Sequence, residues 1–246
     1  MSLDFDSARL NNSYLTAEHE EWRAQLRRFF DREVIPFADQ WDEEGALPDE
    51  LWPKAAAVGI LGLGYPEEFG GVSEGIDIWH KNILNEEMAR IAVGGLSATL
   101  MVHGIGLPPV LNFASEAIKQ EVAPPVLAGT KRISLAITEP GAGSDVAHLT
   151  TTARLDGDHY LVNGSKTYIT GGMNANWFTT AVRTGGEGAG GVSALLIPAD
   201  LAGVSRTALD KKQGWWCSDT ATIYFDNVRV PVGNLVGQEN RGFSVI

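Results

Sequence analysis

The chain has 246 residues, 44% of them hydrophobic and 20% charged, which is typical of a globular protein with one large or two modest domains. Its formal net charge is -12 and no run is rich in lysine or arginine, so nucleic acid and anionic membranes are not expected as partners. The single cysteine, Cys217, excludes an internal disulfide framework and fits a reducing compartment.

The sequence also argues against export and membrane insertion. No apolar run is expected to reach the length of a bilayer-spanning helix, so no membrane span is predicted. The N-terminal segment, residues 1–6, is acidic and unlike the arginine-rich transit peptides of organelles. We therefore expect a cytoplasmic, bacterial protein.

The first half of the chain is predicted to be helical. Thr16 is a candidate N-cap, because acidic residues fill the turn after it and favour a helix N-terminus. An apolar stripe with helical spacing then runs from Trp22 to Val34 and ends before Pro36. Further helices are expected over residues 50–58 and 78–91, with one or two more over 96–110. Another is expected from Ser115 to an interruption at Pro124-Pro125.

Near Lys131 the pattern changes to short apolar segments bounded by turns, which predicts strands. Asp156-Gly157 and Asn163-Gly164 are predicted hairpin turns, because both pairs tolerate positive φ. Strands are expected over residues 133–138, 150–155, 159–162, 165–170, 176–183, 192–198 and 220–225. The predicted fold class is α+β: an all-helical N-terminal domain, residues 1–131, followed by an antiparallel β-sandwich or barrel, residues 132–237.

Two polar loops at strand ends are the clearest candidates for a binding site. The segment Thr138–Asp145, with the sequence TEPGAGSD, contains two glycines that let a ligand approach the main chain. A second polar segment, Tyr168–Gly172, ends another predicted strand. Together they predict a flat, anionic cofactor held between two strand ends.

No metal site is expected. His80, His103 and His148 show no ligand spacing with cysteine or carboxylate residues.

Three segments resemble the acyl-CoA dehydrogenase family in their order and spacing. They are Thr138–Asp145, Asn163–Thr170, and Ser218–Thr220 followed by Phe225–Pro231. The resemblance extends over nearly the whole chain. It implies an FAD-dependent oxidoreductase of fatty acid β-oxidation that converts an acyl-CoA to trans-2-enoyl-CoA. It further implies an electron-transferring flavoprotein as partner and a homo-oligomer, a tetramer or dimer, for the full-length protein.

The resemblance also implies roles for single residues. Ile137 and Thr138 would meet the pyrimidine edge of the flavin. Gly143 and Ser144 would approach the FAD pyrophosphate, and Ser144 would also line the acyl pocket.

Three more residues are expected at the flavin. Thr170 would place its hydroxyl at flavin N5, where charge develops as the hydride arrives. Tyr168 would lie against the flavin face, where many relatives have tryptophan. Leu135 occupies a cofactor-contacting position that is often aromatic in the family.

No residue of this chain is assigned as the catalytic base. The family's base is a glutamate in a second helical domain, and both positions at which members carry it would fall beyond Ile246. Residues 238–246 would then begin that domain, and the chain would be an inactive fragment.

Two other functions stay open. An acyl-CoA oxidase or a reduced-flavin monooxygenase would use the same fold but react with oxygen. A protein of a different class, a truncated chain that binds a nucleotide or a protein partner, would perform no catalysis.

Overall fold

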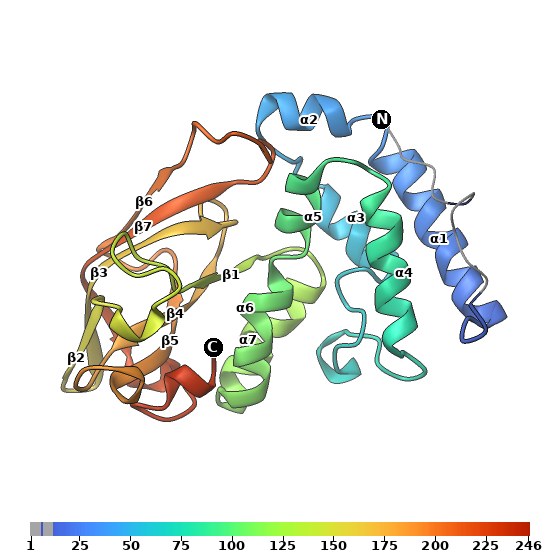
Figure 1. Ribbon diagram of the computed structural model, residues 1–246. Coiled ribbons are helices and arrows are strands. Elements are labelled where there is room, and N and C mark those ends of the chain that lie inside the picture. The colour runs from blue at the N-terminus through green and yellow to red at the C-terminus, as the bar shows by residue number, and fades with distance from the viewer. Residues whose placement is uncertain (1–5, 7–11) are drawn as a thin grey trace. The chain divides into compact units, whose positions relative to one another are not determined.

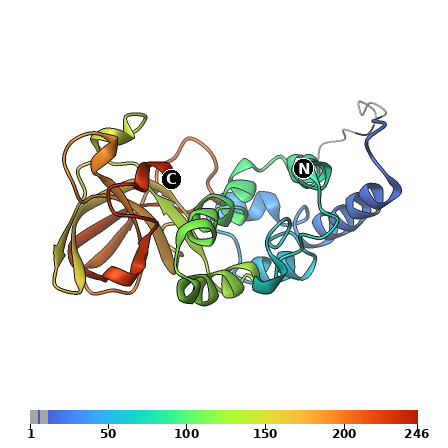
Figure 2. The same ribbon diagram turned by 90° about the horizontal axis from the view of Figure 1, so that it is seen from below.

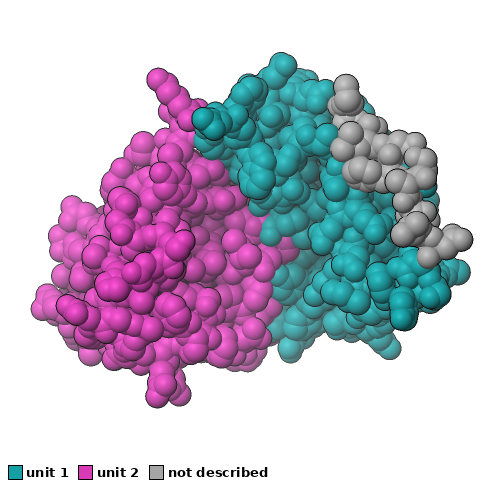
Figure 3. Space-filling model, in the orientation of Figure 1, with its two compact units in different colours: residues 1–101, 127–130, 212–218 teal, residues 102–126, 131–211, 219–246 magenta. Residues whose placement is uncertain are grey.

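The computed structural model describes residue 6 and residues 12–246, and its contacts divide the chain into two compact units. Unit 1 comprises residues 1–101, 127–130 and 212–218, and unit 2 comprises residues 102–126, 131–211 and 219–246 (Figure 3). The predicted domain bounds, 1–131, 132–237 and 238–246, stay predictions.

Unit 1 is helical, as predicted (Figure 1). Its helices are α1 (Ala17–Glu33), α2 (Ala38–Glu44), α3 (Leu51–Ala57), α4 (Ile78–Ala89) and α5 (Gly94–Leu100). Thr16 is confirmed as the N-cap of α1, where its side chain accepts a hydrogen bond from the His19 amide. The apolar stripe of α1, which includes Leu26 and Phe30, is fully buried in the core of this unit.

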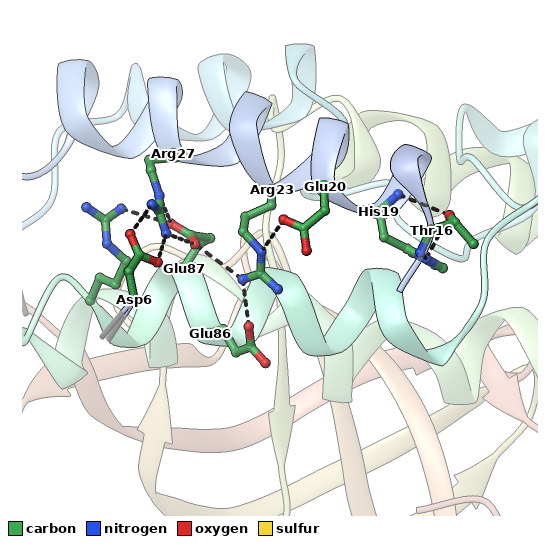
Figure 4. A network of polar contacts seen from close by, with 9 residues as sticks. Asp6, Thr16, His19, Glu20, Arg23, Arg27, Glu86 and Glu87 are labelled. Atoms are coloured by element: carbon green, nitrogen blue, oxygen red, sulfur yellow. Dashed lines mark hydrogen bonds and ion pairs between the residues drawn. The ribbon is translucent and has the colours of Figure 1, made fainter. Parts of the chain in front are cut away.

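Helices α1 and α4 are joined by charged side chains as well as by the core (Figure 4). Glu87 of α4 is only 1% exposed and accepts hydrogen bonds from Arg27 at 2.7 Å and Arg90 at 2.8 Å. Arg23 of α1 lies 2.6 Å from Glu86, which is half exposed. Because Glu87 is buried, its negative charge requires the pairing with Arg27 and Arg90 to offset the cost of desolvation.

Unit 2 combines most of two helices with an eight-stranded sheet. The helices are α6 (His103–Phe113) and α7 (Glu116–Leu127). The strands are β1 (Ile133–Ala136), β2 (Thr152–Asp156), β3 (His159–Thr170), β4 (Trp177–Arg183), β5 (Val192–Pro198), β6 (Val204–Ala208), β7 (Thr220–Pro231) and β8 (Leu235–Val236). Figure 2 shows the strands curled around their own interior, where Phe178, Ile197 and Ile223 form the apolar core.

The sheet order is β6-β7-β3-β2-β4-β5-β8, with β1 paired to β4 outside this path. The α+β class is confirmed, but the sheet is not purely antiparallel. β1 pairs with β4 in parallel from Ile133↔Trp177 to Ala136↔Thr180, and β2 meets β4 in parallel at Thr152↔Arg183. β1 enters the sheet from α7 rather than through a hairpin, so nothing forces it to run antiparallel to its neighbour.

One of the two predicted hairpins is wrong. β2 and β3 are joined at Asp156-Gly157 as expected, but β3 continues through Asn163-Gly164 without turning. Gly164 has a φ of 144° and lies at a shift in the register between β3 and β7. A Cβ there would lie 2.6 Å from the Thr151 hydroxyl, so glycine serves a bulge and a close approach instead of a turn.

The predicted interruption at Pro124-Pro125 is also wrong. Both prolines lie inside α7, which continues to Leu127. Val122 and Ala123 beside them are fully buried. Tertiary packing therefore outweighs the missing backbone donors.

The expectation that no apolar run is long enough to cross a membrane needs correction. Residues 94–113 meet the criteria of length and composition, with a mean hydropathy of 1.2. The structure divides this run into α5 and α6, with a turn at residues 101–102, and buries half of it. Core helices of folded proteins meet the same criteria, so the run is weak support for a membrane span.

Candidate functional site

The two polar segments singled out in the sequence meet within unit 2. The Thr167 amide donates to the Thr138 carbonyl at 2.8 Å, which joins the segment directly after β1 to the C-terminal part of β3. Leu135, Ile137 and Thr138 are each partly exposed, whereas Ala136 between them is buried. Alternation along the strand places Leu135 and Ile137 on the face opposite Ala136, and the chain leaves β1 before Thr138.

A second bulge in β3 exposes Tyr168. The β3–β7 register shifts between Lys166 and Ile169, and Tyr168 between them has a φ of 57°. A bulky residue in the left-handed region is uncommon and costs energy. Here the bulge leaves the Tyr168 side chain 65% exposed, and Thr170 after it is partly exposed and pairs with Thr220.

The loop of residues 139–151, here called the glycine loop, is open on its outer side. Glu139 and Ala142 exchange backbone hydrogen bonds of 2.9 and 3.1 Å, which closes a tight turn over Pro140 and Gly141. No atom lies within 4 Å of the place where a Cβ on Gly143 would stand. Gly143 and Ser144 are both exposed, so a ligand can reach the main chain here.

A buried ion pair lies at the base of this loop. The Lys166 ammonium donates to Glu139 Oε1 at 2.7 Å and to the Ile137 carbonyl at 2.9 Å. Glu139 Oε2 also accepts from the Thr150 amide at 2.6 Å and the Thr150 hydroxyl at 2.7 Å, while Oε1 accepts from the Thr151 amide at 2.9 Å. One carboxylate thus ties together the two ends of residues 139–151.

The surroundings keep both members of the pair charged at neutral pH. Burial by itself opposes ionisation of Glu139, but hydrogen bonds from Lys166 and Thr151 outweigh it and lower its pKa to about 2. Burial lowers the pKa of Lys166 to about 8, and Glu139 offsets part of that effect.

Three hydroxyls of the predicted site are available to a ligand. Thr138, Ser144 and Thr170 have no side-chain hydrogen bond to any residue in the described part of the chain. All three are partly or fully exposed. Each can therefore donate to, or accept from, a bound molecule.

Asp219, from the third sequence segment, fixes the turn that follows Thr170. Its carboxylate accepts from the Met173 amide at 3.0 Å and from the Asn174 side chain at 2.7 Å, and its carbonyl accepts from the Gly171 amide at 2.8 Å. Burial raises the pKa of Asp219, although these hydrogen bonds oppose the rise. Asp219 thus holds in place the turn of residues 171–174, which directly follows Thr170.

All seven residues predicted at the cofactor lie in unit 2, on β1, directly after it, on the glycine loop or on β3: Leu135, Ile137, Thr138, Gly143, Ser144, Tyr168 and Thr170. Their roles toward FAD stay predictions. Sequence reasoning missed Glu139 and Lys166, although both stand inside the quoted segments. A glutamate at the start of the glycine loop and a lysine inside a predicted strand were the available signals.

Unit 1 contains a cluster that the sequence did not predict. His19 Nε2 lies 3.0 Å and His80 Nδ1 2.9 Å from the same oxygen of Asp77. Both imidazoles are buried, and the Asp77 side chain is 49% exposed. Two histidines and a carboxylate could hold a transition metal by composition alone.

Their hydrogen bonds do not fit metal ligation. His19 Nδ1 accepts from the Thr16 amide at 3.0 Å, and His80 Nδ1 accepts from the Asp77 amide at 3.3 Å (Figure 4 shows His19 and Thr16). A metal-bound histidine normally donates from its other ring nitrogen, but the other nitrogen of His19 faces a donor. These histidines complete the N-terminal capping boxes of α1 and α4.

Two family models match the chain. Residues 16–130 match "Acyl-CoA dehydrogenase, N-terminal domain", and residues 134–228 match "Acyl-CoA dehydrogenase, middle domain". The acyl-CoA dehydrogenase AFT10-1 of Alternaria alternata is 36% identical over 97% of this chain and 58% of its own length.

Solved structures agree with these matches. A probable acyl-CoA dehydrogenase from Mycobacterium abscessus is 45% identical, with a TM-score of 0.90 over 95% of this chain and 62% of its own. An acyl-CoA dehydrogenase from Bacillus anthracis, solved in complex with FAD, is 32% identical, with a TM-score of 0.86 over 96% of this chain and 41% of its own. The chain thus spans less than two thirds of the length of these relatives.

Proposed function

Because this chain belongs to the acyl-CoA dehydrogenase family, we propose that it forms the flavin-binding wall of an enzyme that oxidises an acyl-CoA to trans-2-enoyl-CoA. The observation that carries the proposal is the joined edge of β1 and β3, where Thr138 and Thr170 present unpaired hydroxyls. The solved complex of a relative with FAD supports FAD as the cofactor.

The residues present fit FAD. A flavin ring needs hydrogen-bond donors along one edge and a flat apolar contact on its face. Thr138 and Thr170 offer the hydroxyls, and the exposed ring of Tyr168 offers the flat surface. The open main chain at Gly143 and the hydroxyl of Ser144 suit a pyrophosphate, because uncapped amides and hydroxyls bind anions.

FAD, when bound, would supply the hydride acceptor. In this proposal the chain's own residues bind and orient it: Ile137 and Thr138 hold the pyrimidine edge, and Thr170 donates toward N5. Ser144 also lines the acyl pocket. The base that takes the α-proton is expected from a glutamate outside these 246 residues, in a longer protein that contains this chain.

The remaining expectations belong to that longer protein. We propose that it is a homo-oligomer in the bacterial cytoplasm and that it passes its electrons to an electron-transferring flavoprotein.

The test is anaerobic reduction of the flavin by substrate. The purified full-length protein, loaded with FAD, is mixed with straight-chain and branched acyl-CoA thioesters in the absence of oxygen. We expect at least one to bleach the oxidised-flavin absorbance and to yield a product lighter by two hydrogens in mass spectrometry. Bound FAD that no acyl-CoA reduces would contradict the proposal and favour a protein that binds without catalysis.

The oxidase and monooxygenase alternatives differ in how the reduced flavin is reoxidised. A dehydrogenase needs the electron-transferring flavoprotein for fast reoxidation of its reduced flavin, whereas in the alternatives oxygen reoxidises the reduced flavin directly. Stopped-flow mixing of the reduced enzyme with air-saturated buffer therefore separates them.

A further inference from the structure

The buried ion pair of Lys166 and Glu139 lies behind the proposed flavin surface, and nothing in the proposed chemistry yet uses it. Lys166 is fully buried and Glu139 is 4% exposed. Burying two charges is costly, and apolar residues of similar volume are often as stable. A pair in this position therefore calls for a role beyond stability.

The contacts of Glu139 define that role. Its carboxylate binds the Thr150 amide, the Thr150 hydroxyl and the Thr151 amide, eleven and twelve residues further along the chain. It thereby joins the two ends of the loop of residues 139–151, which carries Gly143 and Ser144. This junction of Glu139 with Thr150 and Thr151 is called the neck of the loop. Two charged-acceptor hydrogen bonds to main-chain amides fix the two ends of the loop more strongly than neutral ones would.

The contacts of Lys166 connect the neck to β1. Its ammonium reaches the Ile137 carbonyl as well as Glu139, and the next amide, that of Thr167, binds the Thr138 carbonyl. One short stretch of β3 thus sets the position of both predicted pyrimidine-edge residues. The same strand carries Tyr168 and Thr170 immediately afterwards.

We propose that Lys166 and Glu139 are positioning residues that close the neck of residues 139–151 and hold the β1 end and the glycine loop in the arrangement that binds FAD. This inference rests on the proposed function. Neither side chain is placed in contact with the flavin, so both act through the main chain they hold.

A purely structural role makes a different prediction. If the pair only stabilised unit 2, any equally destabilising change in the sheet core would weaken FAD binding to the same extent. If the pair positions the loop, only changes at the neck would weaken it. Ile197, fully buried in the core on β5, provides the control for that comparison.

The experiment compares Lys166→Met and Glu139→Gln with Ile197→Ala in the purified full-length protein. The FAD dissociation constant is measured by titration at a temperature at which all variants are folded by circular dichroism. We expect the two neck variants to bind FAD roughly ten- to hundredfold more weakly, because small displacements of binding groups have large effects. Ile197→Ala should stay within about twofold of the wild type.

A milder pair of variants guards against failure to fold. Thr150 is an exposed residue, and Thr150→Val removes its 2.7 Å hydroxyl bond to Glu139. Thr152→Val removes the 3.4 Å bond of a neighbouring exposed threonine to the Asn163 carbonyl. Surface changes of this kind rarely unfold a protein. Thr150→Val should weaken FAD binding about two- to fivefold, and Thr152→Val should leave it unchanged.

A second measurement is independent of FAD. Hydrogen exchange of the Ala142, Thr150 and Thr151 amides in the FAD-free protein reports opening of the neck. Lys166→Met should speed exchange at these amides and leave those of β6 unchanged.

The outcomes separate the two proposals. Neck variants that bind FAD as tightly as the wild type, or an Ile197→Ala variant that loses as much affinity, would overturn this inference. A wild-type protein that binds no FAD would overturn the proposed function, and the exchange measurement would then decide alone whether the pair holds the loop.

Discussion

At the scale of single residues, the site combines strain with unused hydrogen-bonding capacity. Tyr168 keeps a left-handed backbone at a bulge, and Thr170 keeps a hydroxyl that no described residue engages. The left-handed backbone lowers folding stability, and the free hydroxyl adds nothing to it. Both are therefore expected to be separable from folding by substitution.

The backbone at Tyr168 gives the first prediction. Glycine adopts a φ of 57° without the Cβ penalty, and the exposed tyrosine ring adds little burial. Tyr168→Gly should raise the free energy of unfolding by about 0.5–1 kcal/mol in urea denaturation and weaken FAD binding. A variant that lost stability while binding FAD normally would contradict this account of the bulge.

Thr170 gives the second. Thr170→Val keeps the β-branched shape and removes only the hydroxyl. The free energy of unfolding should therefore change by less than about 0.5 kcal/mol. Reduction of the flavin by acyl-CoA, followed by stopped-flow absorbance, should slow about a hundredfold, because a donor at a developing charge is lost. Thr207→Val, on β6, is the matched control. Acyl-CoA should reduce the flavin of this variant at the wild-type rate.

The low pKa of Glu139 predicts a loss of stability in acid. Its folded-state pKa of about 2 lies below the ordinary value of 4.5, so the folded protein binds fewer protons than the unfolded chain between these values. The resulting stability, about 3 kcal/mol at most, is present above pH 4.5 and is lost as the pH falls toward 2. Denaturation of Glu139→Gln between these pH values should show a shallower decline, and an identical decline would refute the assignment.

At the scale of elements, the packing of α1 against α4 depends on the buried side chain of Glu87. The arginines around Glu87 come from both helices, which lie side by side in unit 1 (Figure 4). Burial opposes ionisation of Glu87, but hydrogen bonds from Arg27 and Arg90 still lower its pKa. The charge network therefore fixes which faces of the two helices meet.

Removing Glu87 tests that statement. Glu87→Ala leaves Arg23 and Arg27 without their buried partner and should lower the free energy of unfolding by about 3–5 kcal/mol. Glu86→Ala removes a half-exposed partner of the same Arg23 and should cost less than about 1 kcal/mol. Equal losses in the two variants, measured by urea denaturation, would show that burial of Glu87 is unimportant.

The elements also show what local sequence can predict. The start of α1 was predictable because Thr16, the acidic first turn and the apolar stripe all act within a few residues. The Asn163-Gly164 turn was mispredicted because the same dipeptide suits a bulge, and pairing with β7 decides between the two. The parallel partner of β1 is β4, which lies more than 40 residues further along the chain. No local sequence pattern encodes that pairing.

The same distance limit applies to the site. Ile137, Thr138, Tyr168 and Thr170 could be proposed because they stand in segments that resemble a family. The pairing of Glu139 with Lys166 joins residues 27 positions apart, and that of His19 with Asp77 joins residues 58 apart. Such contacts form only after the elements pack, so the sequence indicates the residue types but not the partners.

At the scale of the whole molecule, the joined ends of β1 and β3 are proposed to bind FAD. The two family models together span residues 16–130 and 134–228, so the claim concerns a family member whose relatives extend well beyond this length. A net charge of -12 opposes anion binding in general, so the open main chain at Gly143 is the local feature that favours the FAD pyrophosphate.

The most direct measurement is hydrogen exchange of the purified protein with and without saturating FAD, read peptide by peptide by mass spectrometry. The account predicts slower exchange on FAD addition in residues 137–144 and 168–172, and no change in β6, residues 204–208. Protection confined to other segments, or none at all while FAD is bound, would contradict it.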